Sequence, residues 1–295
     1  MGVPLDRDDP ESGPVGSTVP AVISSLLSIP HAVLLGIVEG ITEFLPVSST
    51  GHLIVVGGLI KFGVGDTRIA GDTYSVAIQF GAILAVLVLY RRRIWSMVRG
   101  LFGRDREGRG ALTAIVAAFL PAAVLGVVVG DAVKDALFGP VPVMIAWFVG
   151  GVALLVWQPK GGRLALHEIP LRSAVVIGLA QALAFWPGVS RSLVTIVGGV
   201  LVGLSLSAAV EFSFLLGLIT LSAATFLDLA KHGGEMFDRF GTVAPLAGLL
   251  CAFVTALVSV RWMVQWLNTR SLRVFGWYRV GAAVVVLALV AGNRL

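Results

Sequence analysis

Two carboxylates lie close together in the segment GIVEGITEFLPVSSTGH, residues 36–52, within an otherwise apolar stretch of the chain. Glu39 and Glu43 are four residues apart, so a helix would place both on one face, one turn apart. Close carboxylates in a poorly solvated site either share a proton or bind a cation. The pair is therefore a candidate site for a divalent cation, Mg²⁺ or Ca²⁺, or for a general acid or base.

Groups suited to an anion follow directly after this pair. Pro46 ends the predicted helix, and a second helix is expected to begin near His52. Between them, hydroxyls and free backbone amides could hold an anion, and they belong to Ser48, Ser49, Thr50 and Gly51. In a soluble protein such a segment is most often a capped helix end with solvated glutamates. Inside a membrane segment an ionisable residue costs about 2.5 kcal/mol or more and instead indicates a functional site.

An arginine lies in a second polar turn, WPGVSRS, residues 186–192. Arg191 could snorkel to a lipid headgroup, but its permanently charged fork also suits a pair of phosphate oxygens. Ser190 and Ser192 flank it. An anion clamp, hydroxyls, an imidazole and two acids are the groups that phosphoryl chemistry uses, provided that the fold brings the two turns together.

The composition places both turns in a membrane protein. The chain is 57% hydrophobic and 13% charged, with a mean hydropathy of +0.93, which is typical of polytopic membrane proteins. Six apolar runs have the length of a transmembrane helix: residues 74–90, 111–129, 141–157, 208–229, 243–267 and 274–291. Residues 29–60 and 171–204 are apolar but interrupted by Pro, Gly and Ser, which predicts two re-entrant helical hairpins.

The two interrupted regions match each other at an offset of 141 residues, with identities at Phe44/Phe185, Pro46/Pro187, Ser49/Ser190, Gly57/Gly198 and Gly58/Gly199. Paired segments of this kind point to a binding site between two repeats. We therefore predict an all-α polytopic membrane protein of two inverted repeats, each a re-entrant hairpin plus three transmembrane helices. The repeats cover about residues 29–157 and 171–292 of a single membrane domain, residues 29–295.

The basic loops predict the orientation. Residues 91–109 contain seven arginines and should be cytoplasmic, so alternating spans place residues 131–140 and 231–240 outside and residues 158–172 and 268–273 inside. Both termini would lie outside. Residues 1–28 form a loose acidic tail, without the basic start and apolar core of a cleavable signal peptide. The net charge of +5 comes largely from these loops and requires no nucleic-acid partner.

The chain resembles the undecaprenyl pyrophosphate phosphatase family, which is also known for bacitracin resistance. The resemblance is carried by GIVEGITEFLPVSSTGH and WPGVSRS, by EFSFLL at residues 211–216, by YSVAIQFGAILAV at residues 74–86 and by the pair Tyr278-Arg279. It implies a bacterial inner-membrane enzyme that removes the terminal phosphate of the lipid carrier on the outer side, assisted by a divalent cation. The family's essential residues would fall on Glu39, Glu43, Ser49, His52 and Arg191.

The resemblance and the residue pattern together suggest a mechanism. Arg191 and the hydroxyl turn would hold the pyrophosphate, and Glu39 or Glu43 would hold the cation. The nucleophile stays open between His52, Ser49 activated by His52, and water, and we favour His52 as nucleophile or base. Substrate contacts would come from Ser48, Thr50, Gly51, Ser190 and Ser192.

One departure from the family concerns Leu193, because the family usually has glycine there. A leucine does not tolerate a positive φ angle, so the pocket and its substrate could differ. Leu193 leaves open a paralogue that binds the lipid without hydrolysing it. A polyprenyl-phosphate flippase is a second alternative to hydrolysis, because it would also use inverted repeats and buried charge.

Some polar residues outside the two turns have no assigned role. Gln79 and Glu211 lie in apolar runs and either support the site or pair within the core. The remaining histidines are expected at the membrane interface, and Cys251 packs in a span. The sequence does not determine the oligomeric state, and a homodimer stays open.

Overall fold

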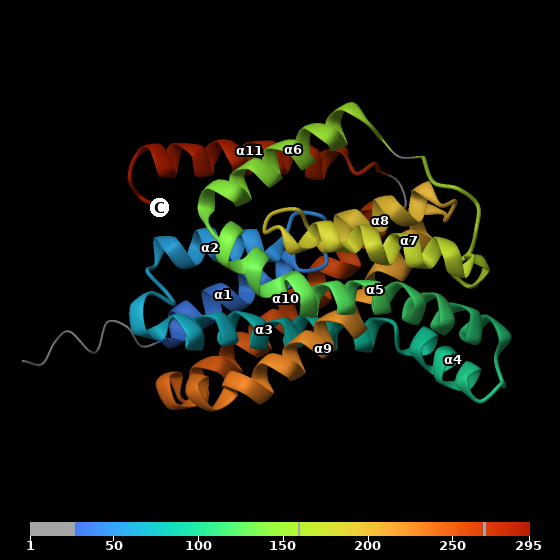
Figure 1. The fold of residues 1–295 in the computed structure, drawn as a ribbon, viewed down its shortest axis with the longest axis horizontal. Coiled ribbons are helices and arrows are strands. Elements are labelled where there is room, and N and C mark those ends of the chain that lie inside the picture. Colours follow the sequence, from blue (N-terminus) through green and yellow to red (C-terminus); the bar gives the residue numbers. More distant parts are fainter. Residues whose placement is uncertain (1–26, 159, 268–269) are drawn as a thin grey trace, which may run out of the picture.

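The computed structural model describes residues 27–158, 160–267 and 270–295 (Figure 1). The predicted acidic tail, residues 1–28, therefore lies outside the described residues except at its end. The described residues form helices and no β-strand. The α-helices are α1 (Ile29–Thr42), α2 (Ser49–Leu59), α3 (Arg68–Leu89), α4 (Arg91–Leu101), α5 (Arg106–Leu137), α6 (Pro140–Val156), α7 (Leu171–Gln181), α8 (Arg191–Leu201), α9 (Leu206–Phe240), α10 (Val243–Leu267) and α11 (Arg273–Ala291).

Within the described residues, five helices are long and apolar enough to cross a membrane: α3, α5, α9, α10 and α11. They confirm an all-α polytopic membrane protein and correspond to five of the six predicted spans. The sixth prediction falls on α6, which has 17 residues and is a shorter apolar helix. A helix of this length lies at the lower limit for crossing the hydrocarbon core of a bilayer.

Three stretches that the sequence analysis assigned to loops are helical. The arginine-rich loop begins with the amphipathic helix α4, which buries Met97 and exposes Trp95. Helix α5 continues to Leu137, and α9 continues to Phe240. The end of α9 contains no proline, and it buries Met236 and Phe240 against the core. Continuing the helix therefore buries apolar surface that a loop would leave exposed.

Two helical hairpins, α1/α2 and α7/α8, enter the molecule from opposite ends, and their tips meet near its middle (Figure 1). Each second helix starts after a serine with a left-handed backbone, Ser48 with φ 72° and Ser190 with φ 73°. This conformation is uncommon for residues other than glycine. Each serine hydroxyl accepts a backbone N–H three residues further on, from Gly51 and Leu193. The two tips are thus built in the same way.

The two hairpins match at an offset of 142 residues, so the predicted offset of 141 is wrong by one residue. Helices α1 and α7 begin at residues 29 and 171, and α2 and α8 begin at residues 49 and 191. At this offset Ser48, and not Ser49, corresponds to Ser190, and the adjacent glycine pairs also shift by one position. Gly57 accepts a hydrogen bond from Phe62, and Gly199 accepts the equivalent bond from Leu204. Gly57 therefore corresponds to Gly199 and not to Gly198. The inverted relation of the two halves stays a prediction.

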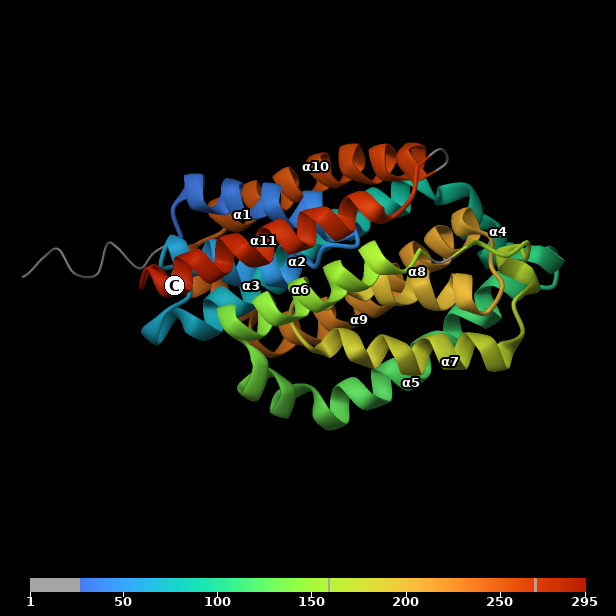
Figure 2. The same cartoon turned by 90° about the horizontal axis from the view of Figure 1, so that it is seen from above.

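Close helix crossings join the first helix of each hairpin to the other half of the chain. Helix α1 packs on α10 where Gly36 faces Gly248, and α7 packs on α5 where Gly178 faces Ala118. A methyl group on Gly36 or Gly178 would collide with the facing backbone. Small residues allow membrane helices to approach this closely. Figure 2 shows the two helix pairs on opposite sides of the molecule.

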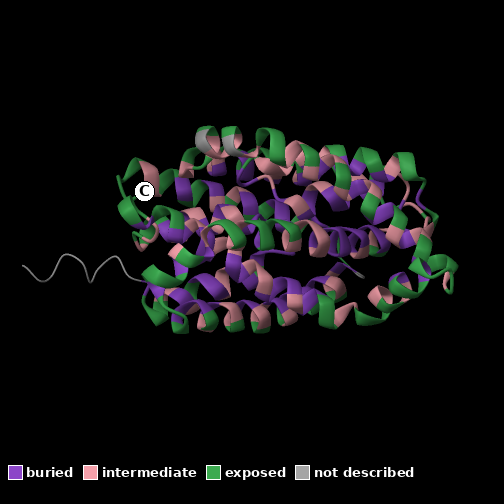
Figure 3. Cartoon of the chain, turned by 60° about the horizontal axis from the view of Figure 1, so that its bottom comes forward, coloured by how far each residue is buried: buried purple, intermediate pink, exposed green. Residues whose placement is uncertain are grey.

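Buried residues face the spaces between the helices, and exposed residues lie on the outer surface and at both ends (Figure 3). Many exposed side chains are large and apolar, and Val127 and Val128 of α5 are 80% and 73% exposed. A soluble monomer rarely presents so much apolar surface. This outer surface suits the hydrocarbon of a bilayer.

Candidate active site

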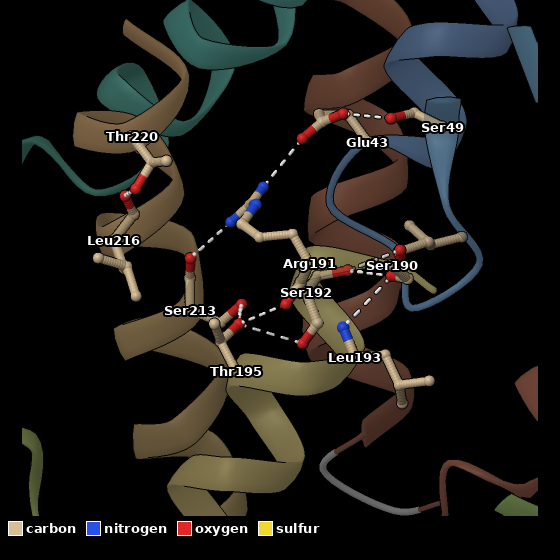
Figure 4. Close-up of polar contacts among 11 residues, drawn as sticks. Glu43, Ser49, Ser190, Arg191, Ser192, Leu193, Thr195, Ser213, Leu216 and Thr220 are labelled. Atoms are coloured by element: carbon tan, nitrogen blue, oxygen red, sulfur yellow. Dashed lines mark hydrogen bonds and ion pairs between the residues drawn. The ribbon is translucent and has the colours of Figure 1, made fainter. Parts of the chain in front are cut away.

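A carboxylate, a hydroxyl and a guanidinium meet where the hairpin tips touch (Figure 4). Ser49 Oγ donates to one oxygen of Glu43, and Arg191 Nη2 lies 2.9 Å from the other oxygen. Helix ends position all three residues, because Glu43 is the C-cap of α1 while Ser49 and Arg191 begin α2 and α8. The structure thus brings together three of the five residues predicted to be catalytic.

Two further groups fix the Arg191 guanidinium. Nη1 donates to the backbone carbonyl of Ser213 in α9 at 2.9 Å, and the guanidinium carbon lies 5.4 Å from the centre of the Phe44 ring. Within the described part of the chain, Nε–H meets no acceptor. The arginine is therefore held in place and keeps Nε–H and one hydrogen of each Nη for a ligand, as an anion site requires.

A pocket of about 170 Å³ opens beside this cluster. One part of its lining is polar and the other part is apolar, which suits an anionic group attached to an apolar chain. The polar part consists of Glu43, Ser48, Ser49, Thr50, Gln79, Gln181, Ser190, Arg191 and Thr220. The apolar part consists of Ala184, Phe185, Pro187 and Leu221.

The remaining turn residues hold the tips against each other. Ser48 Oγ accepts the backbone N–H of Gly188 in the other hairpin at 3.2 Å, and Ser192 Oγ donates to the carbonyl of Leu45 at 2.8 Å. Ser192 and Gly51, which were expected to bind substrate, do not line the pocket. Ser192 joins the two tips, and Gly51 lies against the Trp147 ring, where a side chain would collide.

His52 was the favoured nucleophile or base, but the structure does not place it in the pocket. Its Nδ1 lies 2.6 Å from the carbonyl of Ser48, and its Nε2 lies 2.7 Å from the hydroxyl of Tyr278. Because a carbonyl can only accept, Nδ1 carries the proton and Nε2 accepts from the tyrosine. The ring also packs on Trp147, with centres 4.5 Å apart. Both nitrogens are therefore occupied on the side of the turn that faces α6 and α11.

Glu39 is fully buried one helical turn before Glu43, and it does not line the pocket. Neither of its oxygens meets a hydrogen-bond donor in the described residues. A buried carboxylate without a donor requires a proton or a cation. The described residues contain no group of three or more His, Cys, Asp and Glu that could hold a metal ion. A cation would therefore rest on these two carboxylates and on ligand oxygens, as Mg²⁺ commonly does.

Arg279 of α11 is a site-forming residue whose role the sequence analysis did not identify. It is 1% exposed and has no carboxylate partner among the described residues. Instead it donates to backbone carbonyls of both tips: Nη1 to Pro46 and Val189 at 3.3 Å each, and Nη2 to Gly188 at 2.9 Å. A buried arginine in an apolar span was the signal that could have revealed it.

Three more residues settle questions that the sequence left open. Gln79 lines the pocket, whereas Glu211 pairs with Arg93 of α4 at 2.7 Å and not with the site. Leu193 lies inside α8 with a helical backbone and packs in the core. The left-handed residues of this turn are Gly188 and Ser190. The expected conflict between Leu193 and a positive φ angle is therefore absent.

A family model and several known proteins match this sequence over most of its length. A family model described as bacitracin resistance protein BacA matches residues 32–285. A protein of Sorangium cellulosum named undecaprenyl-diphosphatase is 44% identical over 88% of this chain and 85% of its own length. A protein of Rhodospirillum rubrum named undecaprenyl-diphosphatase 2 is 44% identical over 89% of this chain and 95% of its own length. An undecaprenyl-diphosphatase of Acinetobacter baumannii is 41% identical over 87% of this chain.

Proposed function

The chain belongs to the family of the bacitracin resistance protein BacA, and from this membership we propose that it is an undecaprenyl-diphosphatase. It is a multi-pass membrane enzyme that hydrolyses undecaprenyl diphosphate to undecaprenyl phosphate and inorganic phosphate. This reaction regenerates the lipid carrier for cell-wall synthesis and counteracts bacitracin. The observation that carries the proposal is the cluster of Ser49, Glu43 and Arg191 beside a pocket that is partly polar and partly apolar.

Ser49 is the group best placed to attack phosphorus, because its hydroxyl already donates to a carboxylate. Glu43 accepts the proton as the Ser49 Oγ–P bond forms and the anhydride P–O bond breaks, and it passes this proton to the leaving oxygen of undecaprenyl phosphate, which is released. Water then attacks the phosphoserine. Glu43 accepts a proton from this water and returns it to Ser49 as inorganic phosphate leaves. Arg191 stabilises the charge on the phosphoryl oxygens throughout.

A divalent cation, Mg²⁺ or Ca²⁺, would satisfy the buried oxygens of Glu39, because these oxygens meet no hydrogen-bond donor in the described part of the chain. Glu39 and Glu43 would hold it, together with oxygens of the substrate. When bound, it would neutralise negative charge on the diphosphate. Glu43 is already paired with Arg191, so Glu39 would supply most of the protein's contribution to the metal.

The proposed location is a bacterial inner membrane, with the active site facing outward. The arginine-rich α4 supports this orientation, because basic residues are retained on the cytoplasmic side. Figure 1 places α4 at the end of the molecule opposite to the start of α1. A homodimer is also proposed, and the mass of the protein in detergent would test it.

A polyprenyl-phosphate flippase is the second candidate, because hairpins that enter from opposite ends are a feature of alternating-access carriers (Figure 1). The hypothesis of a paralogue that binds the lipid without hydrolysing it was based on Leu193 in place of the family glycine. Leu193 lies within helix α8, where a leucine is tolerated, so this hypothesis loses its main support. Neither alternative explains a serine hydroxyl that is already bonded to a carboxylate.

Phosphate release from undecaprenyl diphosphate by the purified protein tests the proposal. We expect release by the parent protein and a loss of at least a hundredfold in Ser49→Ala and Glu43→Gln. If the parent protein releases no phosphate but moves polyprenyl phosphate between leaflets of a vesicle, the flippase is correct. Ser207→Ala is a matched control, because the exposed Ser207 makes a hydrogen bond to Ser205 at the start of α9, away from the pocket.

A further inference from the structure

Gln181 is a buried amide without a partner at the wall of the active-site pocket. It ends α7, is 2% exposed and lines the pocket together with Glu43, Ser49 and Arg191. Neither its Nε2 nor its Oε1 has a hydrogen-bond partner in the described residues. The two N–H donors and the oxygen acceptor of this amide are therefore all without a hydrogen-bond partner in the described residues.

An unpaired buried amide is costly, by about 1–3 kcal/mol for each unsatisfied group. Native proteins keep such groups rarely, and a functional ligand is one reason to keep them. Arg191 Nε–H is likewise without an acceptor in the described part of the chain, and Arg191 lines the same pocket. Two residues with unused donors, one charged and one neutral, therefore line a single cavity.

The repeat offset gives Gln181 a counterpart. At 142 residues it corresponds to Glu39, and the two side chains occupy equivalent places in α7 and α1. Both are buried, and neither makes a hydrogen bond within the described residues. A carboxylate at this place suits a cation or a proton, whereas a neutral amide can donate to an anion without repelling it. The two repeats thus carry a carboxylate and a neutral amide at equivalent positions.

We propose that Gln181 is a catalytic residue that contacts the diphosphate of the substrate: Nε2 donates to a non-bridging phosphoryl oxygen beside Arg191, and Oε1 accepts from the water that hydrolyses the phosphoserine. This inference rests on the proposed function. The Gln181 amide is neutral, so it does not repel the diphosphate. Because it has both a donor and an acceptor, the same side chain can contact the anion and the water. A carboxylate at position 181 would keep the acceptor but repel the diphosphate.

The test compares Gln181→Met and Gln181→Glu with the parent enzyme in detergent, using undecaprenyl diphosphate as the substrate. Methionine has nearly the shape of glutamine but no donor and no oxygen acceptor, so kcat/KM should fall at least tenfold. The melting temperature should not fall, because an apolar side chain replaces unpaired polar atoms. The Gln181→Glu variant should lose more activity than Gln181→Met. Gln265→Met is the control, since Gln265 is exposed on α10.

The two proposals can fail separately. If the parent enzyme releases phosphate and Gln181→Met keeps its kcat/KM, the inference is wrong and the proposed function stands. If Gln181→Met loses activity only in proportion to a lower melting temperature, Gln181 is a structural residue and the inference is also wrong. If the parent protein itself releases no phosphate, the proposed function is wrong and the inference falls with it.

Discussion

Replacing Arg191 by lysine keeps the positive charge but removes the planar fork. In the structure the guanidinium reaches Glu43 and the carbonyl of Ser213 at 2.9 Å each, and it lies over Phe44. A single ammonium cannot occupy both nitrogen positions. At least one hydrogen bond to a charged group is therefore lost, which is worth about 1.5–3 kcal/mol.

That loss corresponds to a fall in kcat/KM of about ten- to a hundredfold, at about 1.4 kcal/mol for each factor of ten. Phosphate release from undecaprenyl diphosphate, measured over a range of substrate concentrations, gives kcat and KM for the parent enzyme and for Arg191→Lys. Arg172→Lys on the exposed start of α7 serves as the matched control. A lysine variant that turns over at the parent rate would show that the fork of Arg191 does not bind the transferred phosphate.

Three other predictions concern the cation, the histidine and the topology. A chelator should abolish phosphate release, added Mg²⁺ or Ca²⁺ should restore it, and Glu39→Gln should raise the metal concentration required by about tenfold; full activity in chelator would exclude the metal. His52→Gln keeps a donor for the Ser48 carbonyl, so it should retain activity to within about tenfold, at about 1 kcal/mol for the weakened contact; complete loss of turnover would restore His52 as the nucleophile. In a Cys251→Ala background, Arg104→Cys should resist an impermeant thiol reagent in intact cells while Ser12→Cys reacts; the reverse labelling would invert the orientation.

Local sequence signals were sufficient for the membrane class and for the core of the site. Pro46 and the serines after it marked the break between α1 and α2, and the charge of Arg191 in an apolar segment marked the second tip. Such signals depend on a few adjacent residues. Helix ends beyond the apolar runs were less predictable, because α9 continues through residues 231–240 and ends only at its C-cap Gly241, ten residues further than the loop assignment allowed.

Contacts between distant segments could not be predicted from the sequence. The hydroxyl of Tyr278 is separated from His52 by 226 residues along the chain, so nothing local indicated that the imidazole bonds to this tyrosine and does not line the pocket. Gln181 and Thr220 were missed because a single amide or hydroxyl in a helix resembles an ordinary polar position until the cavity beside it is known. The repeat offset was wrong because the adjacent serines and the adjacent glycines match in two registers, and the matches Phe44/Phe185 and Pro46/Pro187 lie between the two helices of each hairpin.

The position of Arg279 has a consequence for biosynthesis. Its guanidinium binds the carbonyl of Pro46, which is 233 residues earlier in the chain, as well as carbonyls of the second tip. The ribosome therefore completes both hairpins before it makes the residue that ties them together. Nascent chains that end before α11 contain Ser49, Glu43 and Arg191 but lack the donor shared by the two tips. Assembly of the site is thus linked to insertion of the last helix, because a chain that ends before Arg279 lacks the hydrogen bonds that join the two tips to α11.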